Sequence, residues 1–276
     1  MLIPITFRNV VCILWGLLAL ISGCNLEKDI EINLPPYQSQ MVVECYMEPG
    51  RPVRLSLVES SPYLAKPEIN IIQDAEVTIA RNGVPETLKY GVGMDEVTRK
   101  FYTHTTNGVL QANPGDVFTL TITDPNGRRL EGSTTILPVV NIDTVEFNFN
   151  DKGQSLIVTR FKDDGNTKNY YLFSVHKDSL NHQEEIDYTS SDELNNGKPF
   201  VFGTGYDFDP GDSVIVTLQH IDKAYFDFQE SVQDARSANG NPFAQPGQVK
   251  STVQGGLGVF TYLAYDRKKL AVPPKK

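Results

Sequence analysis

The stretch MVVECYM at Met41–Met47 sets the pattern that dominates the chain. Its apolar side chains alternate with more polar ones, so that Met41, Val43, Cys45 and Met47 share one face of an extended strand. Such alternation is typical of a half-buried β-strand, with one face on a core and the other in solvent. We therefore predict a strand here, and a buried structural role for Cys45 rather than a reactive one.

The same period of two continues downstream. Alternating segments lie at 53–57, 75–79 and 118–122. Turn-forming residues such as Asn82-Gly83 separate them, and no helical period is sustained before Thr135. This pattern predicts a first antiparallel, immunoglobulin-like β-sandwich at 41–138.

A second block of alternating segments begins after Pro138. It contains 145–149, 156–161, 171–175, 200–202 and 214–221. The turn DPGD at 209–212 resembles NPGD at 113–116 in the first block, which leaves internal duplication open. We predict a second, consecutive β-sandwich domain at 139–270 and a tail at 271–276, so the expected fold class is mainly β.

One segment departs from the β pattern. Beyond Asp222, a candidate N-cap, apolar side chains recur at three- and four-residue spacing until Asn239-Gly240. We predict one amphipathic helix at about 223–236 in the second domain, packed on one sheet. A partner-facing helix is the alternative.

The N-terminus contains an apolar run at 10–21 behind the single cation Arg8. The run is typical of a signal-peptide h-region and is too short to cross a bilayer. The sequence ISGC at 21–24 resembles a bacterial lipobox. We therefore predict a lipoprotein signal peptide at 1–23 that is cleaved between Gly23 and Cys24.

The lipobox implies that Cys24 becomes the acylated first residue of the mature protein. The polar, acidic stretch at 24–40 then serves as a tether. An ordinary secretory signal with a stray cysteine is the alternative.

The charge balance indicates how the protein attaches to a membrane. Removing 1–23 takes away one cation, and 24 cations minus 34 acidic residues gives a net charge of −10. This excess argues against nucleic acid and against an anionic bilayer surface as electrostatic partners. Attachment then depends on the lipid, because several acyl chains such as palmitate hold stably where one does not.

Motifs for catalysis are missing from the sequence. The four histidines, His104, His176, His182 and His220, lack zinc-ligand spacing, and there is no nucleophile elbow. Acidic pairs such as Asp163-Asp164 are explained by solvated loops, although a hydrolase would need two carboxylates across a cleft. We predict no catalytic residue, no metal and no cofactor, with an enzyme kept as a further alternative.

Two segments are candidates for a partner or ligand surface. The loop at 203–211 carries Tyr206 and Phe208, which we expect to be exposed. The second segment contains Asn241, Pro242, Phe243, Gly255, Gly256 and Gly258. Its glycines permit close approach by another backbone. The ligand expected at this surface is a small molecule or a peptide.

Several motifs together carry a family resemblance. They are the lipobox, Met41-Val42-Val43-Glu44, Asp74-Ala75-Glu76-Val77, Asn169-Tyr170-Tyr171, Asn241-Pro242-Phe243 and the glycine-rich 255–260. Their order is similar to that of a Bacteroidota outer-membrane lipoprotein family known as domain of unknown function 4249. Cys45 departs from the pattern, which has glycine there.

The resemblance implies an accessory role in nutrient uptake, because members of the family are often encoded beside TonB-dependent transporters. It supplies no catalytic residue. We therefore expect a non-enzymatic lipoprotein, anchored in the outer membrane through Cys24, with the cell surface favoured over the periplasmic face. A surface adhesin or structural spacer without a transporter partner is the alternative.

Overall fold

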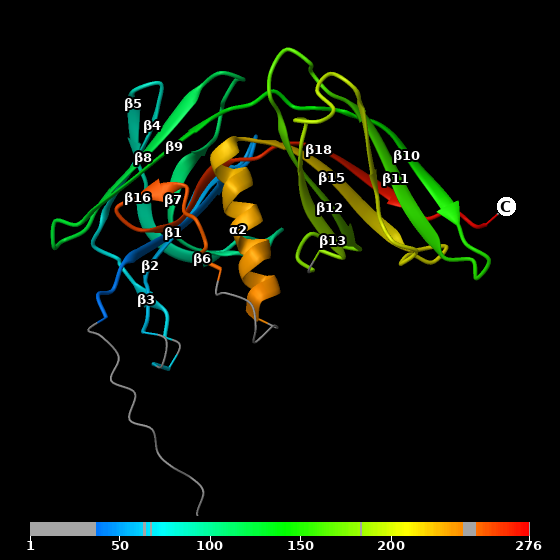
Figure 1. Ribbon diagram of the computed structural model, residues 1–276. Helices are drawn as coiled ribbons and strands as arrows, with labels where there is room; N and C mark the ends of the chain where they lie inside the picture. The colour runs from blue at the N-terminus through cyan, green and yellow to red at the C-terminus, as the bar shows by residue number, and fades with distance from the viewer. Residues whose placement is uncertain (1–36, 63–64, 67, 183, 240–246, 276) are drawn as a thin grey trace, which may run out of the picture. The chain divides into compact units, whose positions relative to one another are not determined.

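The computed structural model describes residues 37–62, 65–66, 68–182, 184–239 and 247–275. The predicted signal peptide, Cys24 and most of the tether lie outside these residues, as do Asn241, Pro242 and Phe243. Residues 39–276 form one compact unit, which is mainly β-strand with a single helix in its described part (Figure 1). Within the described part of the chain, no helix meets the length and hydropathy that a bilayer span requires.

The first β-sandwich consists of two sheets. One contains β1 (Met41–Met47), β2 (Pro52–Glu59), β3 (Asn70–Ile71), β6 (Lys89–Met94), β7 (Phe101–Val109) and β17 (Leu257–Tyr262). The other contains β4 (Glu76–Arg81), β5 (Val84–Thr87), β8 (Val117–Thr123), β9 (Arg129–Thr135) and β16 (Val253–Gln254). Their strand orders are β17-β1-β2-β7-β6, with β3 beside β2, and β16-β9-β8-β4-β5. The predicted burial of alternate β1 residues, Cys45 included, is confirmed, because they lie in the shared core.

The second β-sandwich also has two sheets. They contain β10 (Ile142–Phe149), β11 (Ser155–Lys162) and β14 (Pro199–Gly203), and β12 (Tyr170–Lys177), β13 (Ile186–Ser191), β15 (Ser213–Ile221) and β18 (Ala264–Ala271). The strand orders are β10-β11-β14 and β13-β12-β15-β18. Aromatic rings fill the core between them, where Phe161 lies 4.8 Å from Tyr171 and 5.4 Å from Phe202 between ring centroids.

The two sandwiches share one topology. The order β9-β8-β4-β5 matches β18-β15-β12-β13, and β1-β2-β7 matches β10-β11-β14. The two similar turns occupy equivalent corners, where the Gly115 amide donates to the Ile136 carbonyl at 2.8 Å and the Gly211 amide to the Val272 carbonyl at 2.9 Å. Both glycines have a positive φ, 94° and 96°. The shared order and corners support internal duplication.

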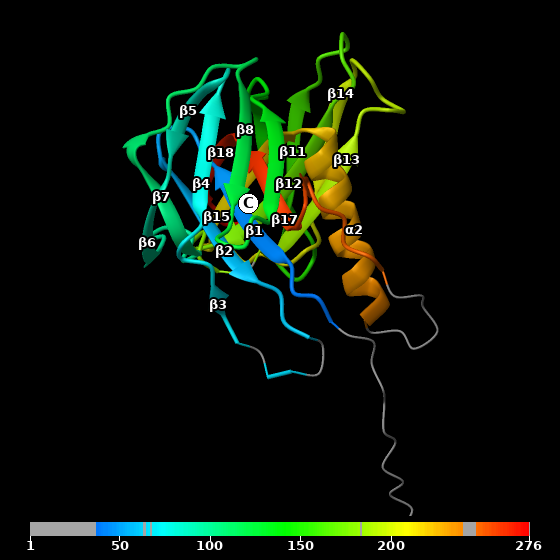
Figure 2. The same ribbon diagram turned by 90° about the vertical axis from the view of Figure 1, so that its left-hand side faces the viewer.

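An insertion between β15 and β18 distinguishes the second sandwich. It begins with α2 (Lys223–Asn239), and the predicted N-cap is confirmed because Asp222 Oδ1 accepts a hydrogen bond from the Tyr225 amide at 2.8 Å. The helix lies beside β12, β13 and β17, and Figure 2 shows it flanking β13. A third cluster of buried side chains, which includes Tyr170, Leu172 and Val259, packs under it.

The insertion then returns to the first sandwich. β16 pairs with β9, and β17 pairs with β1 in parallel, with Val43 opposite Gly258. β16 and β17 lie within the range 139–270 in sequence, but they belong to the sheets of the first sandwich. The division of the strands between the two sandwiches therefore does not coincide with the predicted boundary after Pro138, and that boundary stays a prediction.

Candidate functional site

The structure separates the two aromatic residues predicted at the surface. Tyr206 is 42% exposed, as expected. Phe208 is fully buried, so the expectation that it is exposed was wrong. Its backbone forms an antiparallel bridge with Ser155, and its ring enters the core of the second sandwich.

The glycine-rich segment is required by packing within the chain. A Cβ at Gly258 would overlap the Val43 carbonyl oxygen, and one at Gly255 would overlap the Arg129 carbonyl oxygen. A Cβ at Gly256 would lie 2.6 Å from the Met41 carbonyl oxygen, which is also too close. These glycines therefore permit the close approach of other backbone segments of the same chain. A role for them in contacting a partner stays a prediction.

A cleft of about 460 Å³ is lined by the more polar faces of several strands. The alternating pattern predicts that such faces are exposed to solvent. One wall is formed by β1, β2 and the β6–β7 turn, the floor by β12, β15 and β18, and a second wall by α2. A volume of this size is typical of sites for small molecules, which often lie between domains. We call this feature the central cleft.

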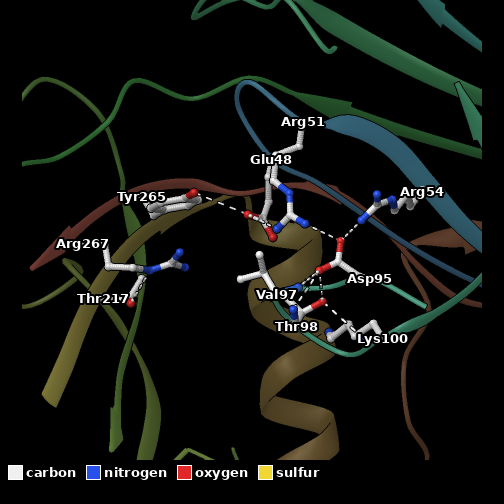
Figure 3. Close-up of polar contacts among 10 residues, drawn as sticks. All are labelled: Glu48, Arg51, Arg54, Asp95, Val97, Thr98, Lys100, Thr217, Tyr265 and Arg267. Atoms are coloured by element: carbon white, nitrogen blue, oxygen red, sulfur yellow. Dashed lines mark hydrogen bonds and ion pairs between the residues drawn. The ribbon is translucent and has the colours of Figure 1, made fainter. Parts of the chain in front are cut away.

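The first wall is organised around Asp95 (Figure 3). Its carboxylate accepts hydrogen bonds from the guanidinium groups of Arg51 and Arg54 and from the amides of Val97 and Thr98, at 2.9 and 2.8 Å. Burial opposes ionisation of Asp95, but these hydrogen bonds outweigh it and lower the pKa of its carboxyl. Glu48 Oε2 also lies 3.4 Å from Arg51, so that two carboxylates, Glu48 and Asp95, balance the charges of the two arginines.

The floor presents a third arginine in a different setting. Arg267 Nε donates a hydrogen bond to Thr217 Oγ1 at 3.0 Å, and the guanidinium lies 4.2 Å from the centroid of the Tyr265 ring. The Tyr265 hydroxyl donates to Glu48 Oε2 at 3.4 Å, which joins the floor to the first wall (Figure 3). The Thr217 hydroxyl and the Tyr265 ring together hold the Arg267 side chain in place.

Two buried polar atoms that line the cleft have no partner within the described part of the chain. They are His176 Nδ1 on β12 and Gln219 Oε1 on β15. The other ring nitrogen of His176 lies 3.5 Å from Glu184, and this hydrogen bond lowers the pKa of Glu184 to about 2. Buried polar atoms are normally paired, so these two mark positions where a ligand can bond.

The helix contributes an aromatic wall. Tyr225 meets Tyr46 of β1 edge to face at 6.1 Å and stacks with Phe228 at 6.0 Å between centroids. Lys100 Nζ lies over the Tyr46 ring at 3.8 Å from its centroid. Burial raises the pKa of Tyr225, whose hydroxyl accepts a hydrogen bond from Gln229 Nε2 at 2.7 Å. The cleft therefore combines aromatic surfaces with placed polar groups, as ligand sites do.

These features define the chain as a tandem β-sandwich protein with a small-molecule-sized cleft between its sheets. The chain belongs to the family described as Domain of unknown function (DUF4249), whose family model matches residues 27–269. No curated protein matches it.

One of the solved structures that match is a chain titled "Cytokine receptor complex - Crystal form 1A". It is 9% identical with a TM-score of 0.28, and the match covers 84% of this chain and 97% of that one. A likeness this low carries no inference about function.

Proposed function

We propose that this protein is a non-enzymatic lipoprotein, anchored in the outer membrane through Cys24, that binds a small polar ligand in the central cleft. The observation that carries this proposal is the pair of unpartnered buried atoms, His176 Nδ1 and Gln219 Oε1. A buried polar group without a partner costs about 1–3 kcal/mol, and a bound ligand would supply the missing hydrogen bonds.

Anchoring through the N-terminus suits this role. A tether of 24–40 reaches at most about 60 Å when fully extended, which allows the cleft to work close to the membrane without contacting it. Because the mature chain is strongly acidic, the lipid and not surface charge would hold it there.

The ligand site is tested by filling the cleft. Ser174 is buried on the floor, and Ser174→Phe would occupy the space of a ligand. Ser133→Phe makes the same change at an exposed position of β9 that does not line the cleft, and serves as the control. Native mass spectrometry of full-length protein from its own membranes should show a bound small molecule in the wild type and in Ser133→Phe only. A ligand retained by Ser174→Phe would refute the site.

As a second element of the proposal, the protein is an accessory component of a TonB-dependent transporter in nutrient uptake. The support comes from the lipobox and from membership of the family. A mild-detergent pull-down should recover a transporter in stoichiometric amount, and the Cys24→Ala variant, which lacks the anchor, should lose it from the membrane fraction.

Tyr206→Ala is the appropriate surface variant, because Tyr206 is exposed whereas Phe208 and Gly255 serve the fold. Reduced recovery of the transporter with Tyr206→Ala would assign this loop to the partner surface. A solitary lipoprotein in every pull-down would favour the adhesin or spacer role.

A further inference from the structure

The floor of the central cleft carries an arginine that the fold positions but does not neutralise. Arg51 pairs with Glu48 and Asp95, Arg54 pairs with Asp95, and Arg236 lies 3.7 Å from Asp187. Arg267 is held by Thr217 and Tyr265, neither of which is charged, and among the described residues no carboxylate lies within ion-pair distance of it. Its Nε is occupied by Thr217, which leaves the terminal nitrogens of the guanidinium for a ligand.

The unpartnered atoms lie on the same face of the same sheet. Thr217 is the cross-strand partner of Arg267, and Gln219 is that of Tyr265, one alternation further along β15. On the other side of β15, Ser174 lies opposite Thr217, and His176 follows two residues later on β12. His176 is only 7% exposed, so its Nδ1 is fixed and shielded from bulk water. One charged donor and two further hydrogen-bonding atoms thus line one floor.

We propose that the central cleft takes a small ligand that combines one carboxylate with hydrogen-bond donors. The carboxylate would pair with the terminal nitrogens of Arg267, since guanidinium groups match carboxylates in charge and geometry. N–H or O–H groups of the ligand would donate to Gln219 Oε1 and to His176 Nδ1 in its neutral form. This inference rests on the proposed function, because it specifies the ligand of the same cleft.

The remaining charges in the cleft restrict the ligand further. Besides Arg267, the cleft is lined by five carboxylates, from Glu44, Glu48, Asp95, Glu184 and Asp187, and by four cations, Arg51, Arg54, Lys100 and Arg236. These charges nearly balance, at four positive against five negative, so they would not compensate an anion that carries several charges, such as a phosphate ester, and favour a ligand with a single carboxylate. Short peptides and sugar acids share the required chemistry, and the aromatic wall of Tyr225 and Phe228 offers either of them an apolar contact.

Matched probes separate these ligands. Full-length protein in detergent is titrated by calorimetry with pooled dipeptides and with their C-terminal amides, and with glucuronate and galacturonate against glucose and galactose. We expect binding by at least one carboxylate pool and binding at least about tenfold weaker by its counterpart without the carboxylate. A response to dipeptides or to sugar acids identifies the source.

Two failures are distinguishable. Equal binding of a carboxylate and its counterpart without the carboxylate would overturn this inference and leave ligand binding in the cleft intact. If no probe of either kind binds, the inference is overturned, and the mass spectrometry of native protein decides separately on the proposed function.

Variants assign the contact to Arg267. Arg267→Gln should weaken the carboxylate probe at least about tenfold, whereas Arg267→Lys, which keeps the charge, should weaken it less. Arg160→Gln, at an exposed arginine on β11, is the control and should bind as the wild type does. Thermal unfolding of each variant verifies that it is folded. Unchanged affinity in a folded Arg267→Gln protein would contradict the proposal.

Gln219→Leu gives a readout that a purely structural role would not produce. The substitution removes a buried acceptor without a partner, so the ligand-free protein should melt at the same temperature or higher. The same variant should bind the probe more weakly. A lower melting temperature together with unchanged affinity would show that Gln219 serves the fold and not the ligand.

Discussion

Tyr225 of α2 meets Tyr46 of β1 edge to face, with ring centroids 6.1 Å apart. The helix belongs to an insertion of the second sandwich, whereas β1 belongs to the first, so this contact joins elements far apart in the sequence. Both residues line the central cleft. The stability of the insertion and the shape of the cleft are therefore expected to depend on each other.

The N-cap of α2 tests this dependence. Asp222 accepts hydrogen bonds from the Tyr225 amide and from the Thr134 hydroxyl, each at 2.8 Å. We expect Asp222→Ala to lower the free energy of unfolding by about 1 kcal/mol or somewhat more, as the loss of a cap does. Urea denaturation measures this, with Asp234→Ala on the exposed face of the same helix as the control. Equal stability of the two variants would contradict the capping role.

The return of β17 to β1 depends on glycine at 258. Its φ is 120°, and a side chain there would overlap the Val43 carbonyl. Gly258→Ala should therefore cost roughly 2 kcal/mol or more, through strain or loss of the parallel pairing. Gly108→Ala is the matched control, because nothing lies within 4 Å of its Cβ position. Similar unfolding midpoints for both variants would argue against the close approach.

Asp95 makes the stability depend on pH in a defined direction. Its pKa is lowered in the folded protein from an ordinary value of 3.8. Its contribution is therefore fully present above the unfolded-state pKa and is lost as the pH falls through the folded-state pKa.

Asp95→Asn should destabilise the protein by about 2 kcal/mol at pH 7, and the difference from wild type should shrink below about pH 4. Asp74→Asn, at an exposed aspartate, controls for the change of net charge. A difference that is constant with pH would exclude ionisation of Asp95 as its source.

A buried polar network supports the second sandwich. The Asn169 side chain donates to Asp163 at 3.2 Å and to Asp192 at 3.2 Å, and its oxygen lies 3.1 Å from His220 Nε2. Asn169→Ala would leave these buried groups without their shared partner, and we expect a loss of about 2–4 kcal/mol. Asn196→Ala, at an exposed residue of the same region, should change stability by less than about 0.5 kcal/mol. Thermal unfolding compares the two.

Much of the fold follows from local pattern. The alternation at Met41–Met47 placed β1 and its buried face, and Asp222 marked the start of α2, because strand burial and helix capping depend on neighbours in the chain. The pairing of β17 with β1 was not predictable in this way. The partner of a strand is set by tertiary packing. The glycines at 255–258 indicated close approach to another backbone, but they did not indicate which segment supplies it.

The central cleft was missed for a related reason. An outward polar residue such as Arg267 has the same pattern whether it faces solvent or another wall. β12 did carry a signal, since Tyr170–Lys177 is buried on both faces and its sequence YYLFSVHK is richer in apolar residues than a solvent-facing strand requires. Phe208 was misplaced because the bridge to Ser155 joins segments that are distant in the sequence.

Hydrogen–deuterium exchange tests most directly that the central cleft binds a ligand. Full-length protein in detergent would be compared with and without a low-molecular-weight extract of the growth medium. The proposal predicts slower exchange in β12, β15, β18 and α2 for the wild type and for Ser133→Phe, and no change for Ser174→Phe. Protection confined to other strands, or protection that persists in Ser174→Phe, would contradict it.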